Sequence, residues 1–283
     1  MSNKVVRSTS NPGVKQVVKL RNARERRGTG LFCIEGFREL KRAIEGKVKI
    51  ERLYFCPELY LGEHEDELVV AAASRGAETI EVSRDPFEKM SYRDRPEGLL
   101  AVAEQFDTSL DRITLGATPL VLVVERIEKP GNLGTMIRAA GAAGADAVIV
   151  ADPTTDVFNP NVVRSSIGTS FIVPIAVTPT DDAITWLREH DVQIVASTPH
   201  TDTPHWDAPL AGPAAIVVGS EQYGLSITWL GENDIEVAIP MPGDAVDSLN
   251  ASASAAILLF EAVRQRKRIA PDTDAGEDTR AIP

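Results

Sequence analysis

The chain reads GNLGTMIRAA at 131–140, VVGSEQYGLS at 217–226 and IPMPGDAVDSLNASASAA at 239–256. Each stretch follows or continues an apolar run typical of a buried parallel strand, and each has glycines and small polar residues where a helix is expected to begin. Ligands of α/β proteins bind at the carboxyl ends of such strands. The three stretches therefore predict an α/β fold in which distant turns meet at one ligand site.

Six apolar runs predict the strands of the domain that holds these turns. They lie at residues 119–125, 146–151, 171–177, 191–197, 214–220 and 234–240. A long helix is expected from about residue 247 to 268, and the polar tail at 271–283 is expected to be disordered. We assign this domain to residues 119–270.

The chain ahead of this domain predicts a smaller α/β domain at residues 1–105. Its expected elements are strands at 32–36, 50–56, 79–82 and 99–104 and helices at 37–46 and 66–76. Residues 106–118 are polar and turn-prone without sustained periodicity, so they predict a linker.

The first domain carries a strong positive charge in an otherwise acidic protein. Residues 1–49 hold 13 Lys/Arg and 4 Asp/Glu, although the whole chain has a formal net charge of -11. Residues 11–30, NPGVKQVVKLRNARERRGTG, predict one basic helix that ends at its glycines. A solvated arginine-rich face is one interpretation, and phosphate binding is the other. The candidate RNA contacts are Lys15, Lys19, Arg21, Arg24, Arg26 and Arg27.

Composition argues against several other classes of protein. Cys33 and Cys56 have no metal-ligand spacing, so neither a disulfide framework nor a zinc site is expected, and no metal is predicted elsewhere. The N-terminus lacks the apolar segment of a signal peptide, and no run approaches a membrane span of about 20 apolar residues. A soluble, cytoplasmic protein without a membrane partner is expected. Gly131 and Gly134 form G-x-x-G rather than G-x-G-x-x-G, which disfavours a nicotinamide-dependent enzyme.

In this order and spacing, the three turns resemble the motifs of the SpoU (TrmH-like) branch of the SPOUT RNA methyltransferases. The resemblance implies a trefoil-knotted α/β domain that uses S-adenosylmethionine to methylate ribose 2′-hydroxyls, and a homodimer joined through this domain. Residues 10–20 and 32–40 resemble the L30e-like substrate-binding domain that precedes the catalytic domain in many of these enzymes. Structured RNA, most of all 23S-type ribosomal RNA, is the implied partner.

The first motif supplies the arginine on which the implied chemistry depends. The family pattern N-x-G-x-x-x-R is matched by Asn132, Gly134 and Arg138, and we expect Asn132 to cap the helix. A guanidinium stays protonated and is a poor base, so we expect Arg138 to grip a phosphate and stabilise the developing alkoxide. A surface salt bridge is the alternative for Arg138.

The second and third motifs imply the rest of the site. Gly219 and Glu221 match G-x-E-x-x-G-L, so Glu221 is expected to orient the site, by pairing with Arg138, or else to cap a helix at Leu225. Asn250 is implied as an active-site neighbour, and Ser248 has helix capping as its alternative. The implied cofactor contacts are Ser197, Thr198, Gly219, Ile239, Met241, Ser248 and Leu249.

One further stretch, FNPNVVRSSIGTSFIVP at 158–174, resembles the segment that relatives place beside the RNA. Arg164 and Ser165 are the candidate contacts there, and a plain helix and turn is the alternative.

Two other functions stay open at this point. One is a catalytically silent RNA-binding module for ribosome assembly, and the other is a transfer RNA 2′-O-methyltransferase. The target nucleotide cannot be deduced from the residues.

Overall fold

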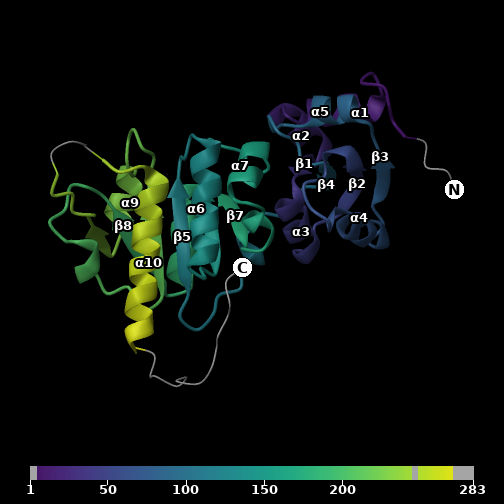
Figure 1. Ribbon diagram of the computed structural model, residues 1–283. Helices are drawn as coiled ribbons and strands as arrows, with labels where there is room; N and C mark the ends of the chain where they lie inside the picture. Colours follow the sequence, from purple (N-terminus) through teal and green to yellow (C-terminus); the bar gives the residue numbers. More distant parts are fainter. Residues whose placement is uncertain (1–4, 244–247, 270–283) are drawn as a thin grey trace, which may run out of the picture.

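The computed structural model describes residues 5–243 and 248–269, which form two sheets connected by one polypeptide (Figure 1). The N-terminal sheet has the strand order β1-β4-β2-β3, and the second sheet has the order β10-β8-β9-β5-β6-β7. The tail for which disorder was predicted, 271–283, lies outside the described residues.

The N-terminal sheet confirms the four strands expected before residue 105. Its strands are β1 (Leu31–Glu35), β2 (Ile50–Phe55), β3 (Glu78–Glu81) and β4 (Leu99–Glu104). The helices are α1 (Pro12–Lys19), α2 (Ala23–Thr29), α3 (Phe37–Glu45), α4 (Glu65–Ser74) and α5 (Arg84–Met90), the last of which was not predicted. Strand β4 is antiparallel to β1 and β2, whereas β2 and β3 are parallel.

The prediction of one continuous basic helix was wrong, because two side-chain caps divide it. Asn11 Oδ1 accepts a hydrogen bond of 2.8 Å from the Gly13 amide at the start of α1. Asn22 Oδ1 accepts one of 2.8 Å from the Arg24 amide at the start of α2. An asparagine at a helix start satisfies a backbone N–H that would otherwise be unpaired, and it therefore starts a new helix here.

The second sheet is parallel at every pairing, as its apolar runs predict. Its strands are β5 (Leu120–Glu125), β6 (Ala147–Ala151), β7 (Ile175–Thr178), β8 (Gln193–Ser197), β9 (Ala214–Val218) and β10 (Ile235–Val237). The helices are α6 (Pro130–Ala142), α7 (Pro160–Ser165), α8 (Thr180–Glu189), α9 (Ile227–Glu232) and α10 (Ala251–Ile269). All six carboxyl ends therefore lie at one edge.

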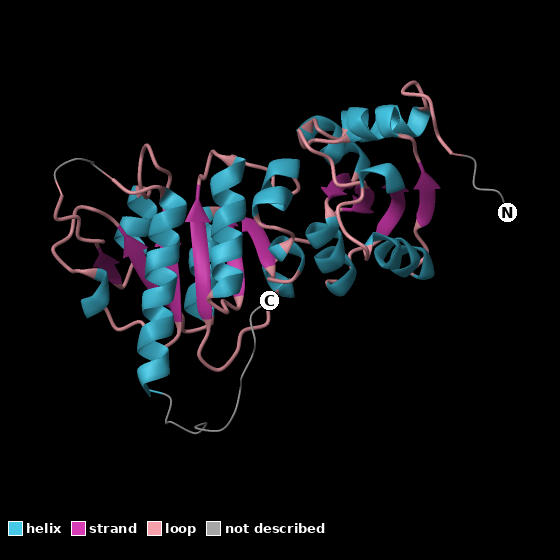
Figure 2. Cartoon of the chain, in the orientation of Figure 1, coloured by secondary structure: helices cyan, strands magenta, loops and turns pink. Residues whose placement is uncertain are grey.

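Helices cover both faces of this sheet. Helices α6, α7 and α10 lie side by side on one face (Figures 1 and 2). Leu122 of β5 packs in the core of that face, while Val121 and Val123 pack with α8 and α9 on the other. Two predicted boundaries were wrong: β7 begins at Ile175 rather than 171, since Thr169–Phe171 forms a short 3₁₀ helix, and α10 begins at Ala251 rather than about 247.

The two sheets share one hydrophobic core where they meet. Four phenylalanines form its centre: Phe106 and Phe158 have ring centroids 4.9 Å apart, Phe32 and Phe158 are 5.0 Å apart, and Phe32 and Phe171 are 6.0 Å apart. Arg26 of α2 adds an ion pair of 2.6 Å to Asp156 in the loop after β6. The N-terminal part is thus packed directly against the loop between β6 and α7.

Candidate cofactor and RNA site

A cavity of about 400 Å³ lies where β8, β9 and β10 end. Ligand sites commonly have about this volume, in the range of roughly 300–1,000 Å³. Every cofactor contact implied by the sequence lines this one cavity: Ser197, Thr198, Gly219, Ile239, Met241, Ser248 and Leu249. The parallel strands bring these turns together although they are far apart in the chain.

The turn after β9 is closed by its own backbone. The Ser220 and Gly224 amides donate to each other's carbonyl groups at 3.1 and 3.0 Å. A Cβ at Gly219 would lie 2.2 Å from the Gly224 carbonyl carbon. Glycine is therefore required at 219 for the turn to close.

Glu221 joins the three motifs through its carboxylate. Its Oε1 accepts hydrogen bonds from Asn132 Nδ2 at 2.8 Å and from Asn250 Nδ2 at 2.6 Å. Its Oε2 accepts one of 2.5 Å from Lys129 Nζ, which also forms an ion pair with it. The Lys129 ammonium holds the pKa of Glu221 below its ordinary value, with the Asn132 amide adding to the effect. Glu221 therefore stays ionised and fixes both amides.

The expected pairing of Glu221 with Arg138 was wrong. Arg138 is exposed on α6, and its side chain forms no hydrogen bond or ion pair with any other described residue. Arg138 follows Asn132 by six positions in the helix, so its side chain is rotated by about 240° around the helix axis relative to that of Asn132. Asn132 faces the junction, and Arg138 consequently projects away from it.

Three helix starts differ from the alternatives that the sequence allowed. Lys129, rather than Asn132, precedes α6. Asn250 Oδ1 accepts from the Ser252 amide at 3.0 Å, so Asn250 rather than Ser248 caps α10. Ser226 precedes α9, and its amide donates to Glu125 at 2.7 Å, so Glu221 is no helix cap. Asn132 and Glu221 therefore serve the junction without capping a helix, whereas Asn250 caps α10 with its Oδ1 and reaches the junction with its Nδ2.

The predicted RNA-binding side chains differ sharply in exposure. Lys15, Lys19, Arg24 and Arg27 are exposed on α1 and α2. Arg21 lies at the surface too, but its guanidinium donates to the Lys89 and Met90 carbonyls at 2.9 and 3.2 Å. Arg26 was wrongly placed among the RNA contacts. Its side chain is 1% exposed and bonded to Asp156 and to the Leu20 and Arg21 carbonyls, so it holds the fold together.

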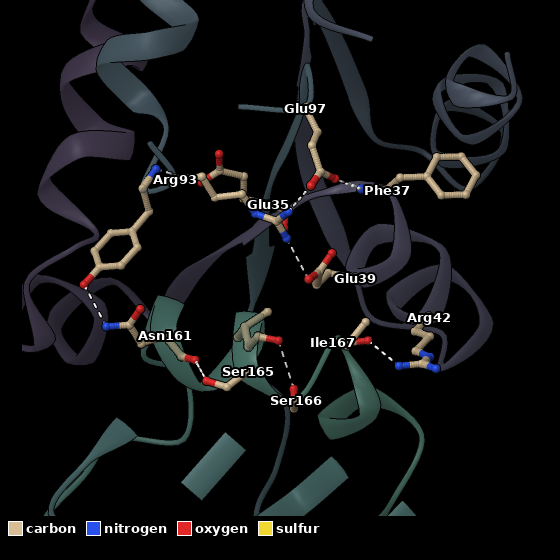
Figure 3. A network of polar contacts seen from close by, with 12 residues as sticks. Glu35, Phe37, Glu39, Arg42, Arg93, Glu97, Asn161, Ser165, Ser166 and Ile167 are labelled. Atoms are coloured by element: carbon tan, nitrogen blue, oxygen red, sulfur yellow. Dashed lines mark hydrogen bonds and ion pairs between the residues drawn. The ribbon is translucent and has the colours of Figure 1, made fainter. Parts of the chain in front are cut away.

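Side chains of the N-terminal part form hydrogen bonds with the segment at 158–174 (Figure 3). Asn161 Nδ2 donates to the Tyr92 hydroxyl at 3.0 Å, and Arg42 Nη1 donates to the Ile167 carbonyl at 2.5 Å. Arg164 is exposed on α7, where it remains available to RNA. The Ser165 hydroxyl donates to the Asn161 carbonyl, so its proton is already used within α7.

Within residues 5–243 and 248–269, no cluster of three or more His, Cys, Asp or Glu side chains could hold a metal ion. Nor is any helix in this part of the chain long and apolar enough to cross a membrane.

Residues 119–260 match the model of the SpoU rRNA Methylase family, and residues 11–101 match the MRM3-like substrate binding domain. The chain belongs to the SpoU rRNA methylase family. The expected membership of the SpoU branch of the RNA methyltransferases is thereby confirmed.

Three relatives show how far the likeness extends. A 23S rRNA (uridine(2479)-2′-O)-methyltransferase from Streptomyces viridochromogenes is 32% identical and aligns over 87% of each chain. The 23S rRNA (guanosine(2553)-2′-O)-methyltransferase RlmP from Bacillus subtilis is 28% identical, over 91% of this chain and 98% of that protein. The crystal structure of an AdoMet-bound rRNA methyltransferase from Sinorhizobium meliloti superposes with a TM-score of 0.84 at 32% identity, covering 92% of this chain and 97% of that one.

The cavity of this SpoU methylase suits an adenosine-bearing cofactor. Ile239, Met241 and Leu249 are half-buried around it and offer an apolar surface to a purine ring. Thr198 and Ser220 add polar groups to the same lining. An apolar lining with a few polar groups is the usual composition of a cofactor site.

Sequence reasoning did not identify Lys129, although this residue bonds to the central carboxylate. The only available signal was a lysine directly before the Pro130-Gly131 turn of the first motif. Charged residues are common before helices, so a lysine at this position does not by itself predict a site residue. Its role becomes visible only because the fold places Glu221 beside it.

Proposed function

We propose that this protein transfers the methyl group of S-adenosylmethionine to a ribose 2′-hydroxyl of large-subunit ribosomal RNA. The observation that carries the proposal is the Glu221 junction, which ties the three motif turns together at the edge of the 400 Å³ cavity. Relatives named as 23S rRNA 2′-O-methyltransferases along most of the chain support ribosomal RNA as the substrate.

The cavity residues hold the cofactor in this proposal. Ile239, Met241 and Leu249 contact the adenine, and Ser197, Thr198 and Ser248 contact the polar parts of the molecule. Bound S-adenosylmethionine supplies an electrophilic methyl group. The turns exclude water around it and fix the line along which the ribose oxygen approaches, and such positioning lowers the barrier.

The junction residues act on the ribose. Glu221 holds the amides of Asn132 and Asn250 in one orientation, so that both can bind the ribose hydroxyls. Arg138 projects away from the junction of its own chain, so in this proposal it acts on the site of a second copy, where it binds the neighbouring phosphate and stabilises the charge that develops on the 2′-oxygen. The hydroxyl proton leaves to water, because the guanidinium has no site to accept it.

The residues outside the cavity bind the RNA. In this proposal residues 1–105 form the L30e-like substrate domain, 106–118 the linker and 119–270 the knotted methyltransferase domain. The exposed cations of α1 and α2 contact phosphates without reading sequence. Arg164 of α7 contributes from the catalytic side. A cytoplasmic location follows from the ribosomal substrate and is part of the same proposal.

Two copies form the active enzyme in this proposal, joined through the catalytic domain. Ile257 and Phe260 of α10 are 37% and 48% exposed, and α10 packs beside α6, which carries the exposed Arg138. Large exposed apolar side chains gathered on one helix are typical of a protein interface. A dimer across this face would place Arg138 near the site of the partner subunit.

The direct test maps 2′-O-methylated nucleotides in ribosomal and transfer RNA from cells with the gene, without it, and with the Arg138→Ala gene. We expect one site in large-subunit ribosomal RNA to lose its methyl group without the gene and with the variant. Sites that change only in transfer RNA would favour the transfer RNA enzyme. An unchanged map, together with defective ribosome assembly, would favour a silent module.

A further inference from the structure

A second cavity of about 500 Å³ opens at the same edge of the sheet, above the strands that the cofactor cavity does not use. Pro153 to Asn159, from the loop after β6, form one side of it, and Val177 near the end of β7 lies in its lining. Ala23 and Arg27 of α2 form the opposite side. The cavity therefore lies between the basic N-terminal helices and the catalytic sheet.

One turn separates the two cavities. Pro130 lines the second cavity, whereas its neighbours Lys129 and Asn132 bond to Glu221, which lines the cofactor cavity. Residues 129–132 are thus a common wall. A ribose held at Asn132 would have the cofactor on one side of this wall and the second cavity on the other.

The lining of the second cavity combines an apolar wall with two charged groups. Val157, Phe158 and Val177 provide the apolar part. The Arg26 and Asp156 side chains are bonded to each other and to backbone groups, so they have little left to offer a ligand. Glu128 and Arg27 are exposed, and neither side chain forms a hydrogen bond or ion pair with another described residue; Glu128 bonds only through its carbonyl, which accepts from the Thr155 hydroxyl at 2.8 Å.

This chemistry favours a flat ring that has both hydrogen-bond donors and acceptors. A carboxylate accepts from ring N–H or amino groups, and a guanidinium donates to carbonyl oxygens or ring nitrogens. Apolar side chains can stack on or flank such a ring. A phosphate alone would be repelled by the negative charge of Glu128. An aliphatic ligand would leave the charges of Glu128 and Arg27 without a polar partner.

We propose that this cavity receives the base of the methylated nucleotide, flipped out of the RNA when its ribose reaches the Asn132–Glu221 junction. The inference rests on the proposed function and adds a site to it. Enzymes that act on one nucleotide within folded RNA commonly unstack it, and a pocket for the base compensates for the lost stacking. Ala23, Arg27 and Glu128 are the specificity-determining residues of this site.

The test uses two synthetic RNA hairpins that contain the mapped target site. One has the natural base at the target position, and the other has an abasic ribose there that keeps its 2′-hydroxyl. The full-length protein is compared with Ala23→Phe, which adds an aromatic ring to the wall of the cavity without changing charge, and with Glu128→Gln. Glu189→Gln, at an exposed position of α8, is the matched control for the loss of a carboxylate.

We expect the wild-type protein to lose about tenfold or more in kcat/KM on the abasic hairpin, the loss typical of a base contact. Ala23→Phe and Glu128→Gln should show a similar loss on the natural hairpin and little further loss on the abasic one. Glu189→Gln should behave as wild type. Affinity for S-adenosylmethionine, measured by calorimetry, should be unchanged in all three variants, which also shows that they are folded.

Two results would overturn the base site while leaving the proposed function intact. One is equal methylation of both hairpins by the wild-type protein. The other is an equal loss on both hairpins in Ala23→Phe. Failure of the wild-type protein to methylate even the natural hairpin would instead overturn the proposed function, and the base site with it.

Discussion

Glu221 is surrounded by three donors that come from two different turns of the chain, and two of them are neutral amides. A carboxylate that lost its charge could no longer accept from all three. Ionisation of Glu221 thus decides whether Asn132 and Asn250 keep their orientation. The positive charge of Lys129, 69% exposed beside it, supports the ionised form.

Replacement of Lys129 by methionine should make the enzyme more sensitive to acid. Lys129 lowers the pKa of Glu221, so the ionised junction persists in the wild-type protein below the ordinary titration range of glutamate and is lost only as the pH falls further. Without Lys129 that pKa rises, and the acid limb of kcat/KM should move to higher pH. The profile is measured from about pH 7 down to about pH 3.5, which spans the ordinary glutamate range.

Lys49→Met is the matched control, because the pKa of each lysine is raised mainly by one carboxylate, that of Glu221 for Lys129 and that of Glu104 in the N-terminal sheet for Lys49. Its pH profile should equal that of the wild type. Superimposable profiles for Lys129→Met and wild type would show that Lys129 is not a positioning residue for Glu221.

Arg138→Ala should lower kcat by about 100- to 1,000-fold, the loss typical when one preorganised charge is removed from a transition state. S-adenosylmethionine affinity should stay unchanged, since Arg138 lies outside the cofactor cavity. Single-turnover kinetics and calorimetry measure the two quantities. A variant with near-normal turnover would exclude this role for Arg138.

The sequence predicted which residues lie together where their position depends on the end of a strand. It predicted poorly which partner a side chain contacts, because that depends on the direction of the side chain. The expected cofactor contacts line one cavity, and this gathering was predictable because motif turns follow parallel strands, whose carboxyl ends must meet. The partner of Glu221 and the burial of Arg26 were not predictable. The tertiary fold places Lys129 opposite Glu221 and Asp156 opposite Arg26, and in each pair the two residues are far apart in the sequence.

At the scale of the secondary-structure elements, α6 and α7 pack closely against each other beside the site. A Cβ on Gly134 would lie 2.5 Å from the Val162 carbonyl oxygen and 2.8 Å from Ser165 Cβ. The glycine of the first motif thus allows α7, which carries Arg164, to pack directly on α6, which carries Arg138. The two helices form one unit that connects the RNA-facing segment with the first motif.

Gly134→Ala should therefore destabilise the protein by about 1–3 kcal/mol, the usual cost of forcing extra atoms into a packed contact. Gly131→Ala is the control in the same helix, since a Cβ there would meet no atom within 4 Å. It should be neutral or slightly stabilising, because alanine favours helix. Urea unfolding measures both, and equal free energies of unfolding would contradict the tight contact.

Strands were predictable from apolar runs, whereas helix ends were not. The basic segment 11–30 has helical periodicity throughout, yet Asn22 divides it by capping α2. Residues 171–173 are as apolar as the strand that follows, but Phe171 is needed in the aromatic core between the sheets. Local caps and long-range packing override propensity at these positions.

Across the whole molecule, the contact between the two sheets depends on a buried cation. The Arg26 side chain is 1% exposed and its partner Asp156 is 24% exposed. Asp156→Asn would leave the guanidinium buried without a counter-charge, which typically costs about 3–5 kcal/mol. Glu58→Gln, which removes one of the two carboxylate partners of exposed Arg84, should change the free energy of unfolding by less than about 1 kcal/mol.

Chemical denaturation followed by tryptophan fluorescence compares these two variants. If Asp156→Asn were as stable as Glu58→Gln, the ion pair would not hold the N-terminal part in place.

The sequence indicated a linker at 106–118, but it could not show that Phe106 at its start packs into the shared core. Domain contacts leave no periodic pattern in a single sequence.

Assembly is testable at the same scale. Phe260→Asp should convert a dimer into a monomer in sedimentation velocity experiments, because it places a charge on the apolar face of α10. Leu61→Asp alters an equally apolar residue, 78% exposed in the N-terminal part, and should remain dimeric. A wild-type protein that is monomeric and active would refute the proposed dimer.

The most direct measurement is methyl transfer by the purified protein itself. Tritiated S-adenosylmethionine is incubated with large-subunit ribosomal RNA from cells that lack the gene, and the RNA is then digested to nucleosides. We predict that the label appears in one 2′-O-methylnucleoside, at close to one methyl group per RNA molecule. Label in a base, or no label in ribosomal RNA with the wild-type protein, would contradict the account.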